Sequence, residues 1–238
     1  RNMFAVGLVC WLFNRDLKIA EDFIREKFAK KPEIAGANIK VIHAGYDYGR
    51  NTHASVAHTY KIESKTTVPG RYMDITGNKA TAYGFIAAAE KAGLKLFLGS
   101  YPITPATDVL HELSKHKSLG VMTVQCEDEI SGCATSIGAA FAGALAVTST
   151  SGPGVCLKSE AMNLAVITEL PLVVLDVQRG GPSTGLPTKS EQTDLLQALF
   201  GRNGESPMPV IAASSPTSCF DAAYMASKIA LEHMTPVV

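Results

Sequence analysis

Residues 145–177 read LAVTSTSGPGVCLKSEAMNLAVITELPLVVLDV, and this stretch decides the fold. The apolar runs at 145–148 and 172–177 do not alternate with polar residues, which is typical of strands buried on both faces. A segment with helical spacing lies between them, at 159–168. A strand, a helix and a second strand in this order predict two parallel strands joined by a crossover helix.

The same alternation continues on both sides of this stretch. Further strands are expected at 94–98, 121–125 and 210–213, and a sixth is expected to begin at Pro236. Helices are expected at 79–92, 107–115, 129–143, 191–200 and 219–233. The predicted fold class is therefore α/β, a doubly wound parallel sheet.

The first 49 residues follow a different pattern. Apolar residues at 20, 23, 24 and 28 predict one amphipathic helix, and a second is expected between Pro32 and Gly45. Residues 50–74 are polar and lack periodicity. We therefore expect a helical tail of another domain at 1–49, a linker at 50–74 and the sheet domain at 75–238. Because the chain begins at Arg1 and stops at the opening of a strand, we also expect both ends to be cut from a longer protein.

Composition narrows the classes of function. Lys plus Arg and Asp plus Glu number 22 each in 238 residues, so no net positive charge is available to gather nucleic acid or an anionic membrane. The longest apolar run near the start has about ten residues, too few to cross a bilayer. Five widely spaced cysteines without a Cys-x-x-Cys pair predict reduced thiols in a cytoplasmic protein, and no metal site in this chain.

The segments that follow the predicted strands are rich in Gly, Pro and hydroxyl residues. They are 99–105, 126–129, 149–154, 178–185 and 214–217. Any one of them could be an ordinary turn. Because ligands of open parallel sheets bind beyond the carboxyl ends of the strands, five such segments on one edge favour a ligand site there.

Glu129 opens the helix predicted at 129–143. It lies four residues before Cys133, on an apolar stripe that also includes Ile130 and Phe141. We therefore expect its carboxyl to point toward the covered side, whereas the two acidic residues before it can turn to water. Two interpretations stay open: an acidic residue that complements the helix dipole, or a desolvated carboxyl that exchanges or shares a proton.

Arg179 follows the strand at 172–177 and precedes Gly180-Gly181-Pro182. A guanidinium held at a strand end suits a carboxylate, because its planar fork binds both oxygens. A structural pair with Asp176, or a subunit contact, is the alternative.

The segment from Gly152 to Ser159 misses a phosphate-binding loop by one residue, because Leu157 stands where that motif has its second Gly. A nucleoside triphosphatase with Asp176 near magnesium is therefore a second hypothesis. The favoured interpretation is a solvated or locally paired Lys158, with Asp176 as an acceptor at the end of a strand.

Four segments together resemble one family. They read YPITP at 101–105, EDEI at 127–130, TSGPG at 150–154 and RGGPSTGLPT at 179–188. In order and spacing they resemble the alpha subunit of 2-oxoacid:ferredoxin oxidoreductases, most of all the 2-oxoglutarate branch with its fused gamma domain. The resemblance implies that 1–49 is the C-terminal part of a gamma-like domain. It also implies that 75–238 is the pyrimidine-binding domain of a thiamine diphosphate enzyme, truncated at its C-terminal end.

The resemblance also implies an activity and its residues. The reaction is the oxidative decarboxylation of 2-oxoglutarate with coenzyme A to succinyl-CoA and carbon dioxide, with reduction of ferredoxin; pyruvate or a branched-chain 2-oxoacid is the alternative substrate. Glu129 and Thr104 match the catalytic positions. Arg179, Thr184 and Thr104 match residues that bind the substrate, and Tyr101, Pro102, Ile103 and Glu129 match residues that bind the cofactor.

The motif that holds diphosphate and magnesium in such enzymes, Gly-Asp-Gly with a following Asn, is absent, as are cysteines for a cluster. The resemblance therefore implies thiamine diphosphate with magnesium shared with a beta subunit that carries the iron–sulfur cluster, in a dimer of alpha–beta pairs. A non-catalytic scaffold that retains the fold stays open as an alternative.

Overall fold

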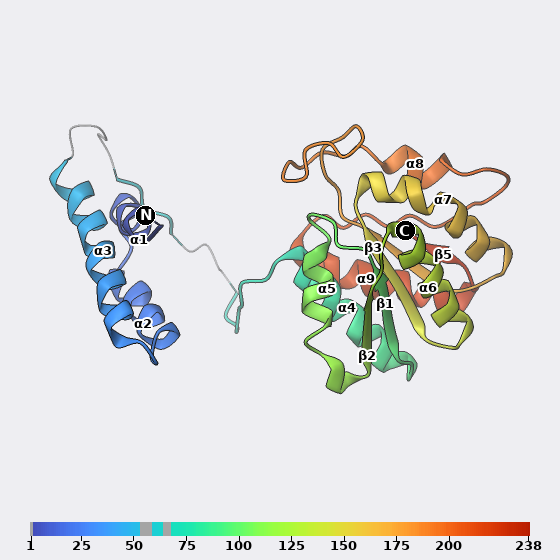
Figure 1. Ribbon diagram of the computed structural model, residues 1–238, viewed down its shortest axis with the longest axis horizontal. Helices are drawn as coiled ribbons and strands as arrows, with labels where there is room; N and C mark the ends of the chain where they lie inside the picture. The colour runs from blue at the N-terminus through green and yellow to red at the C-terminus, as the bar shows by residue number, and fades with distance from the viewer. Residues whose placement is uncertain (1, 53–58, 64–67) are drawn as a thin grey trace. The chain divides into compact units, whose positions relative to one another are not determined.

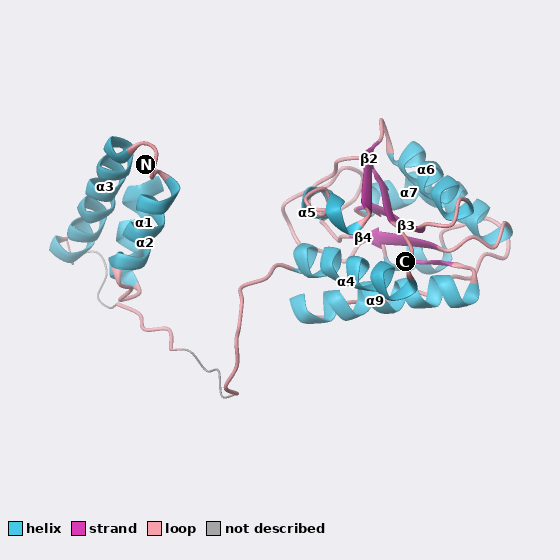
Figure 2. Cartoon of the chain, turned by 90° about the horizontal axis from the view of Figure 1, so that it is seen from below, coloured by secondary structure: helices cyan, strands magenta, loops and turns pink. Residues whose placement is uncertain are grey.

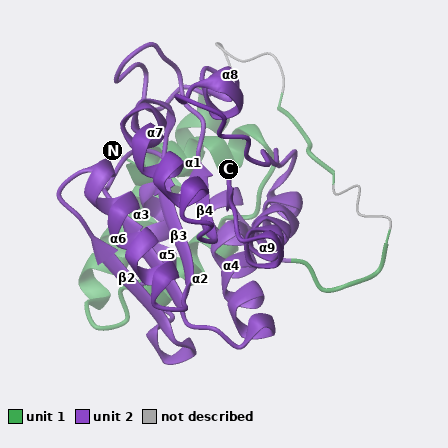
Figure 3. Cartoon of the chain, turned by 90° about the vertical axis from the view of Figure 1, so that its right-hand side faces the viewer, with its two compact units in different colours: residues 1–72 green, residues 73–238 purple. Residues whose placement is uncertain are grey.

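The computed structural model describes residues 2–52, 59–63 and 68–238. The chain divides into two compact units, Arg1–Tyr72 and Met73–Val238 (Figure 3). Each unit is described by itself.

The first unit is helical. Its elements are α1 (Asn2–Leu12), α2 (Leu17–Lys27) and α3 (Pro32–Asn51). Two glycines let α1 and α3 pack closely, because a Cβ on Gly7 would overlap the carbonyl oxygen of Ile42 and one on Gly45 would overlap that of Phe4. The expected helix end at Gly45 is therefore wrong: α3 continues through this glycine, which serves the helix crossing.

Part of the predicted linker belongs to the first unit and packs against the end of α1 and the residues after it. The backbone N–H of Tyr60 donates to the carbonyl of Leu12 at 2.7 Å, and the rings of Phe13 and Tyr60 lie 5.6 Å apart. The Asn14 side chain donates to the hydroxyl of Thr59. Residues 53–58 and 64–67 of the predicted linker lie outside the described residues.

The second unit contains a five-stranded parallel sheet (Figure 1). Its strands are β1 (Leu96–Ser100), β2 (Val121–Gln125), β3 (Leu145–Thr150), β4 (Leu172–Asp176) and β5 (Pro236–Val237), in the order β2-β1-β3-β4-β5. The parallel sheet predicted from the sequence is thus confirmed, and its strands begin within two residues of the predicted positions.

The strand expected at 210–213 is not formed. This segment runs beside the C-terminal residue, where Ile211 N donates to Val238 O and Val238 N donates to Pro209 O. Pro209 has no N–H, so the segment exchanges only this one pair of hydrogen bonds with its neighbour and does not extend the sheet.

Helices cover both faces of the sheet (Figure 2). One face carries α4 (Gly77–Ala92), α5 (Thr107–Leu113) and α9 (Pro216–His233); the other carries α6 (Glu129–Phe141) and α7 (Gly152–Ile167), and α8 (Leu195–Phe200) lies against α7. Successive residues of one strand point to opposite faces of the sheet, so they contribute to two different cores. Leu145 and Val147 of β3 join the first core and Ala146 between them joins the second. None of the described helices combines the length and apolarity needed to span a membrane.

The helix predicted at 159–168 begins seven residues earlier, at Gly152. Pro153 lies in the first turn of this helix. Backbone N–H groups in a first turn have no partner within the helix, so the missing N–H of proline costs no hydrogen bond, and its fixed φ suits a helix. The glycines around Pro153 suggested a loop, whereas the chain turns from β3 directly into α7. By contrast, α8 starts four residues later than its predicted first residue, 191.

Candidate active site at the carboxyl ends of the strands

The strand order places a topological switch point between β1 and β3. From β1 the chain turns outward to β2, and from β3 it continues in the other direction to β4. Ser100, the last residue of β1, pairs with Ser149, the residue before the last of β3, and their hydroxyl oxygens lie 2.7 Å apart. A crevice at the switch point of a parallel sheet is where ligands of this architecture bind.

Glu129 lies at this edge, in the first turn of α6. The side chain of Asp128 caps the helix by accepting from Ser131 N at 2.7 Å, which fixes where α6 starts. Glu129 is only 8% exposed, whereas Glu127 and Asp128 face the solvent, as expected. No described residue donates a hydrogen bond to the Glu129 carboxyl, and its oxygens are not among the fully buried unpaired atoms, so this acceptor is left available to a ligand.

The buried face of α6 differs from the predicted stripe. It consists of Glu129, Gly132, Cys133, Ser136, Ile137 and Ala140. Ile130 and Phe141 are 50% and 83% exposed, so these two residues do not belong to it. Cys133 does, and its buried position confirms that Glu129 shares the covered face.

Gly154 in the first turn of α7 makes room for the Glu129 side chain. A Cβ on Gly154 would lie 2.9 Å from Glu129 Cγ and would overlap the hydroxyl of Thr150. Gly154, the second glycine of the TSGPG segment, is therefore required because the side chains of Glu129 and Thr150 approach it closely. This segment was expected to form a turn or a phosphate loop, and no pattern in the sequence indicates the role of Gly154.

Lys158 is fully buried under the site, not solvated. Its ammonium donates to the carbonyl oxygen of Glu129 at 2.9 Å and to Thr148 Oγ1 at 2.8 Å. The local pairing that the sequence suggested is confirmed. The phosphate-loop hypothesis is wrong, because residues 152–158 form a helix and the lysine is held beneath the edge of the sheet.

Arg179 brings two predicted site loops together. Its two terminal nitrogens donate to the carbonyl oxygens of Thr104 and Thr184, each at 2.8 Å. The guanidinium is buried, and its Nε has no hydrogen-bond partner among the described residues. The expected alternative, a pair with Asp176, is not formed.

The loop that carries Thr104 is fixed at both ends. At its start, Ser100 Oγ donates to the carbonyl of Tyr101. At its end, Asn78 donates to the carbonyl of Pro105 at 2.9 Å, and Thr107 Oγ1 donates to that of Ile103 at 3.0 Å. Tyr101 and Thr104 are exposed, and Pro102 and Ile103 are half-buried. The loop is thus a fixed, accessible wall of the crevice.

Asp176 at the end of β4 neighbours the carboxyl of Asp194, the residue before α8. Burial, followed by the adjacent carboxyl, raises the pKa of Asp176 to about 8. Asp194 is also buried and accepts from Gln178 Nε2 at 3.1 Å. Asp176 was expected to be an acceptor at the end of a strand; the raised pKa makes it a protonated acid at neutral pH, able to donate to Asp194.

This pair predicts a pH dependence of stability. The folded pKa of Asp176 lies above its unfolded value of about 3.9, so the contribution of the protonated pair is complete below about pH 4. It falls by at most about 1.4 kcal/mol per pH unit as the pH rises, and is lost above about pH 8. In Asp176→Asn, the unfolding temperature of the complete subunit should therefore depend less on pH between about 5 and 9 than in the wild type. Asp221→Asn, at an exposed position on α9, is the control, and equal pH dependence of all three proteins would contradict the prediction.

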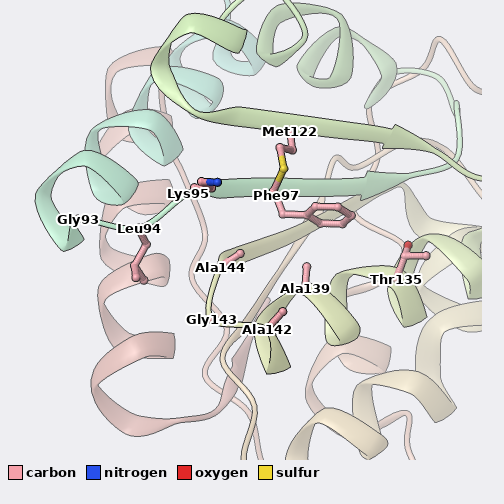
Figure 4. Close-up of a pocket in the computed structure, with 10 residues that line it drawn as sticks. All are labelled: Gly93, Leu94, Lys95, Phe97, Met122, Thr135, Ala139, Ala142, Gly143 and Ala144. Atoms are coloured by element: carbon pink, nitrogen blue, oxygen red, sulfur yellow. The ribbon is translucent and has the colours of Figure 1, made fainter.

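A groove elsewhere in this unit is separate from the site (Figure 4). It is lined by residues before β1 and β3, and also by residues of β1, β2 and α6: Gly93, Leu94, Lys95, Phe97, Met122, Thr135, Ala139, Ala142, Gly143 and Ala144. The residues before β1 and β3 lie at the amino ends of the strands, opposite to Glu129 and Arg179.

The sequence was compared with known families and proteins. Residues 87–238 match the model of the family described as pyruvate flavodoxin/ferredoxin oxidoreductase, thiamine diphosphate-binding. The chain belongs to this family. The resemblance and the fold class inferred from the sequence are thereby confirmed.

Relatives point to one branch of the family. The chain is 60% identical over its whole length to the 2-oxoglutarate oxidoreductase subunit KorA of Mycobacterium tuberculosis, and 42% identical over 69% of its length to the 2-oxoglutarate synthase subunit KorA of Archaeoglobus fulgidus. Among solved structures, it resembles a 2-oxoglutarate:ferredoxin oxidoreductase from Magnetococcus marinus with 2-oxoglutarate, coenzyme A and succinyl-CoA bound. That likeness has a TM-score of 0.79 at 36% identity and covers 99% of this chain and 40% of the other. The chain spans 36% and 46% of the lengths of the two KorA relatives.

Residues of the crevice fit the pyrimidine end of thiamine diphosphate. A buried carboxyl without an internal partner suits a ring nitrogen that carries a proton, and the hydroxyl-rich loops around it suit a polar ring. No three His, Cys, Asp or Glu side chains cluster into a metal site in the parts of the chain that the structure describes.

Proposed function

We propose that this chain is the pyrimidine-binding part of the alpha subunit of a 2-oxoglutarate:ferredoxin oxidoreductase, which forms succinyl-CoA and carbon dioxide and reduces ferredoxin. The buried, unpartnered carboxyl of Glu129 at the switch point carries the proposal. Its chemistry suits the cofactor of the family, and the KorA relatives support the 2-oxoglutarate branch.

Thiamine diphosphate, when bound, supplies a thiazolium carbon that loses its proton and attacks the carbonyl of a 2-oxoacid. Glu129 holds the pyrimidine ring by sharing a proton with its ring nitrogen, and burial strengthens this hydrogen bond. Tyr101, Pro102 and Ile103 form the wall beside the ring. Thr104, exposed at the tip of the same loop, contacts cofactor and substrate.

Arg179 and Thr184 bind the carboxylate of the 2-oxoacid. The support is the position of the guanidinium between the two loops, with a buried Nε–H still unpaired. Since the same guanidinium fixes the carbonyl of Thr104, Arg179 positions the catalytic loop as well as the substrate.

A lysine in place of Arg179 tests this role. Arg179→Lys keeps the charge but loses the fork that joins both loops, so KM for the 2-oxoacid should rise about tenfold or more while thiamine diphosphate affinity stays close to wild type. Arg202→Lys is the matched control, because Arg202 also binds backbone carbonyls, those of Ala198 and Ser206, but away from the crevice. Unchanged substrate kinetics in Arg179→Lys would leave Arg179 with a structural role only.

The remaining components belong to a partner in this proposal. A beta subunit holds magnesium, the diphosphate and the iron–sulfur cluster, and the assembly is a dimer of alpha–beta pairs that uses coenzyme A and ferredoxin. The helical first unit is the end of a gamma-like domain. Five free cysteines support a cytoplasmic setting.

Reduction of a viologen dye by the complete alpha–beta complex tests the proposal. Dye reduction should require coenzyme A and should be fastest with 2-oxoglutarate among 2-oxoglutarate, pyruvate and branched-chain 2-oxoacids. Preference for pyruvate would correct the substrate. No reduction with any 2-oxoacid would favour a non-catalytic scaffold.

A further inference from the structure

Lys158 is the one fully buried charged side chain in the described part of the chain, and the proposed chemistry does not yet use it. It extends from the second turn of α7 and joins two other elements, the first turn of α6 through the carbonyl of Glu129 and β3 through Thr148. Both bonds have the ordinary length of a hydrogen bond, 2.9 and 2.8 Å.

We propose that Lys158 is a positioning residue for Glu129, holding the first turn of α6 against β3. The inference rests on the proposed function of Glu129. A buried ammonium is costly unless polar groups and an opposite charge compensate for its lost hydration. Packing alone would be served as well by an apolar side chain of the same length.

Four titratable groups act on the Lys158 ammonium. On α6 they are Cys133 and Glu129, and before α6 they are Cys126 and Asp128. Burial raises the pKa of the Cys133 thiol to about 11, so this group is neutral at physiological pH. Asp128 is exposed and caps the helix through Ser131.

Glu129 is the buried acidic residue among these groups, and its backbone carbonyl accepts the bond from Lys158. Burial lowers the pKa of Lys158, whereas these acidic neighbours oppose that shift and favour the ammonium. On α7, Glu160 acts on Cys133 and is exposed.

Three variants of the complete complex separate charge from packing. Lys158→Met removes the charge at similar length, and Lys158→Gln removes the charge but keeps an amide donor, so the fold is preserved in at least the second. Thr148→Val is the matched control, because it removes one hydrogen bond of the ammonium and leaves the charge in place.

The first measurement is the rate of exchange of the thiazolium C2 proton. If Lys158 holds Glu129 in place for the pyrimidine ring, exchange should be about tenfold or more slower in Lys158→Met than in the wild type. Lys158→Gln, which keeps a donor, and Thr148→Val, which keeps the bond to Glu129, should lie closer to the wild type. Equal rates in all four proteins would overturn the role of Lys158 toward Glu129.

The second measurement needs no cofactor. Amide hydrogen exchange over residues 129–133 of the cofactor-free complex should be faster in Lys158→Met than in the wild type, because the first turn of α6 loses its bond to Lys158. Unchanged exchange there would overturn the positioning role. Failure of this inference is distinct from failure of the proposed function: the latter appears as wild-type C2 exchange in Glu129→Gln, whatever Lys158 does.

Discussion

Replacing Glu129 by glutamine should slow exchange of the C2 proton of bound thiamine diphosphate by about 10²–10⁴, the range of general acid–base catalysis. The amide has the same size and still hydrogen-bonds to the pyrimidine ring, but it cannot share or accept a proton. Glu129 is only 8% exposed, and an amide of the same size fills the same space, so the substitution should preserve packing. Cofactor affinity should therefore change little.

Deuterium exchange into the cofactor, followed by quenching and NMR, measures this rate directly in the alpha–beta complex. Glu127→Gln is the matched control, because Glu127 lies two residues earlier and is exposed. In this variant the C2 proton should exchange at the wild-type rate. Wild-type exchange in Glu129→Gln would remove Glu129 from the chemistry and leave it as a residue of the first helical turn.

Local pattern was enough to predict most of the fold. The apolar residues of β3 and β4 do not alternate with polar ones, which predicts that helices cover both faces of these strands. The structure confirms that both faces are covered. The pattern failed where a tertiary contact decides the outcome. Gly45 was expected to end a helix, because the sequence does not show that Phe4 of another helix packs against it.

The candidate site was predicted only in outline. The edge of the sheet and the buried position of Glu129 follow from strand order and helical spacing. The bond between Lys158 and Glu129 joins residues 29 positions apart on two helices, and no spacing rule connects them. Likewise, Arg179 could be placed at a strand end, but its bond to Thr104, 75 positions away, depends on how two loops meet.

The complete subunit is expected to be inactive without its beta partner. The crevice offers a carboxyl for the pyrimidine ring and an arginine for a carboxylate. The described residues form no acidic cluster for magnesium, and their five cysteines are dispersed over separate elements. A cofactor about 10 Å or more in length, the reach of some three extended residues, would be held here at its uncharged end only. Viologen reduction with 2-oxoglutarate and coenzyme A should therefore appear only when the partner is added.

Calorimetric titration with thiamine diphosphate and magnesium tests most directly the claim that this chain forms half of a shared site. The complete subunit alone should show no saturable binding at micromolar cofactor, and the complex with the beta subunit should bind it tightly. Tight binding by the subunit alone would contradict the shared site.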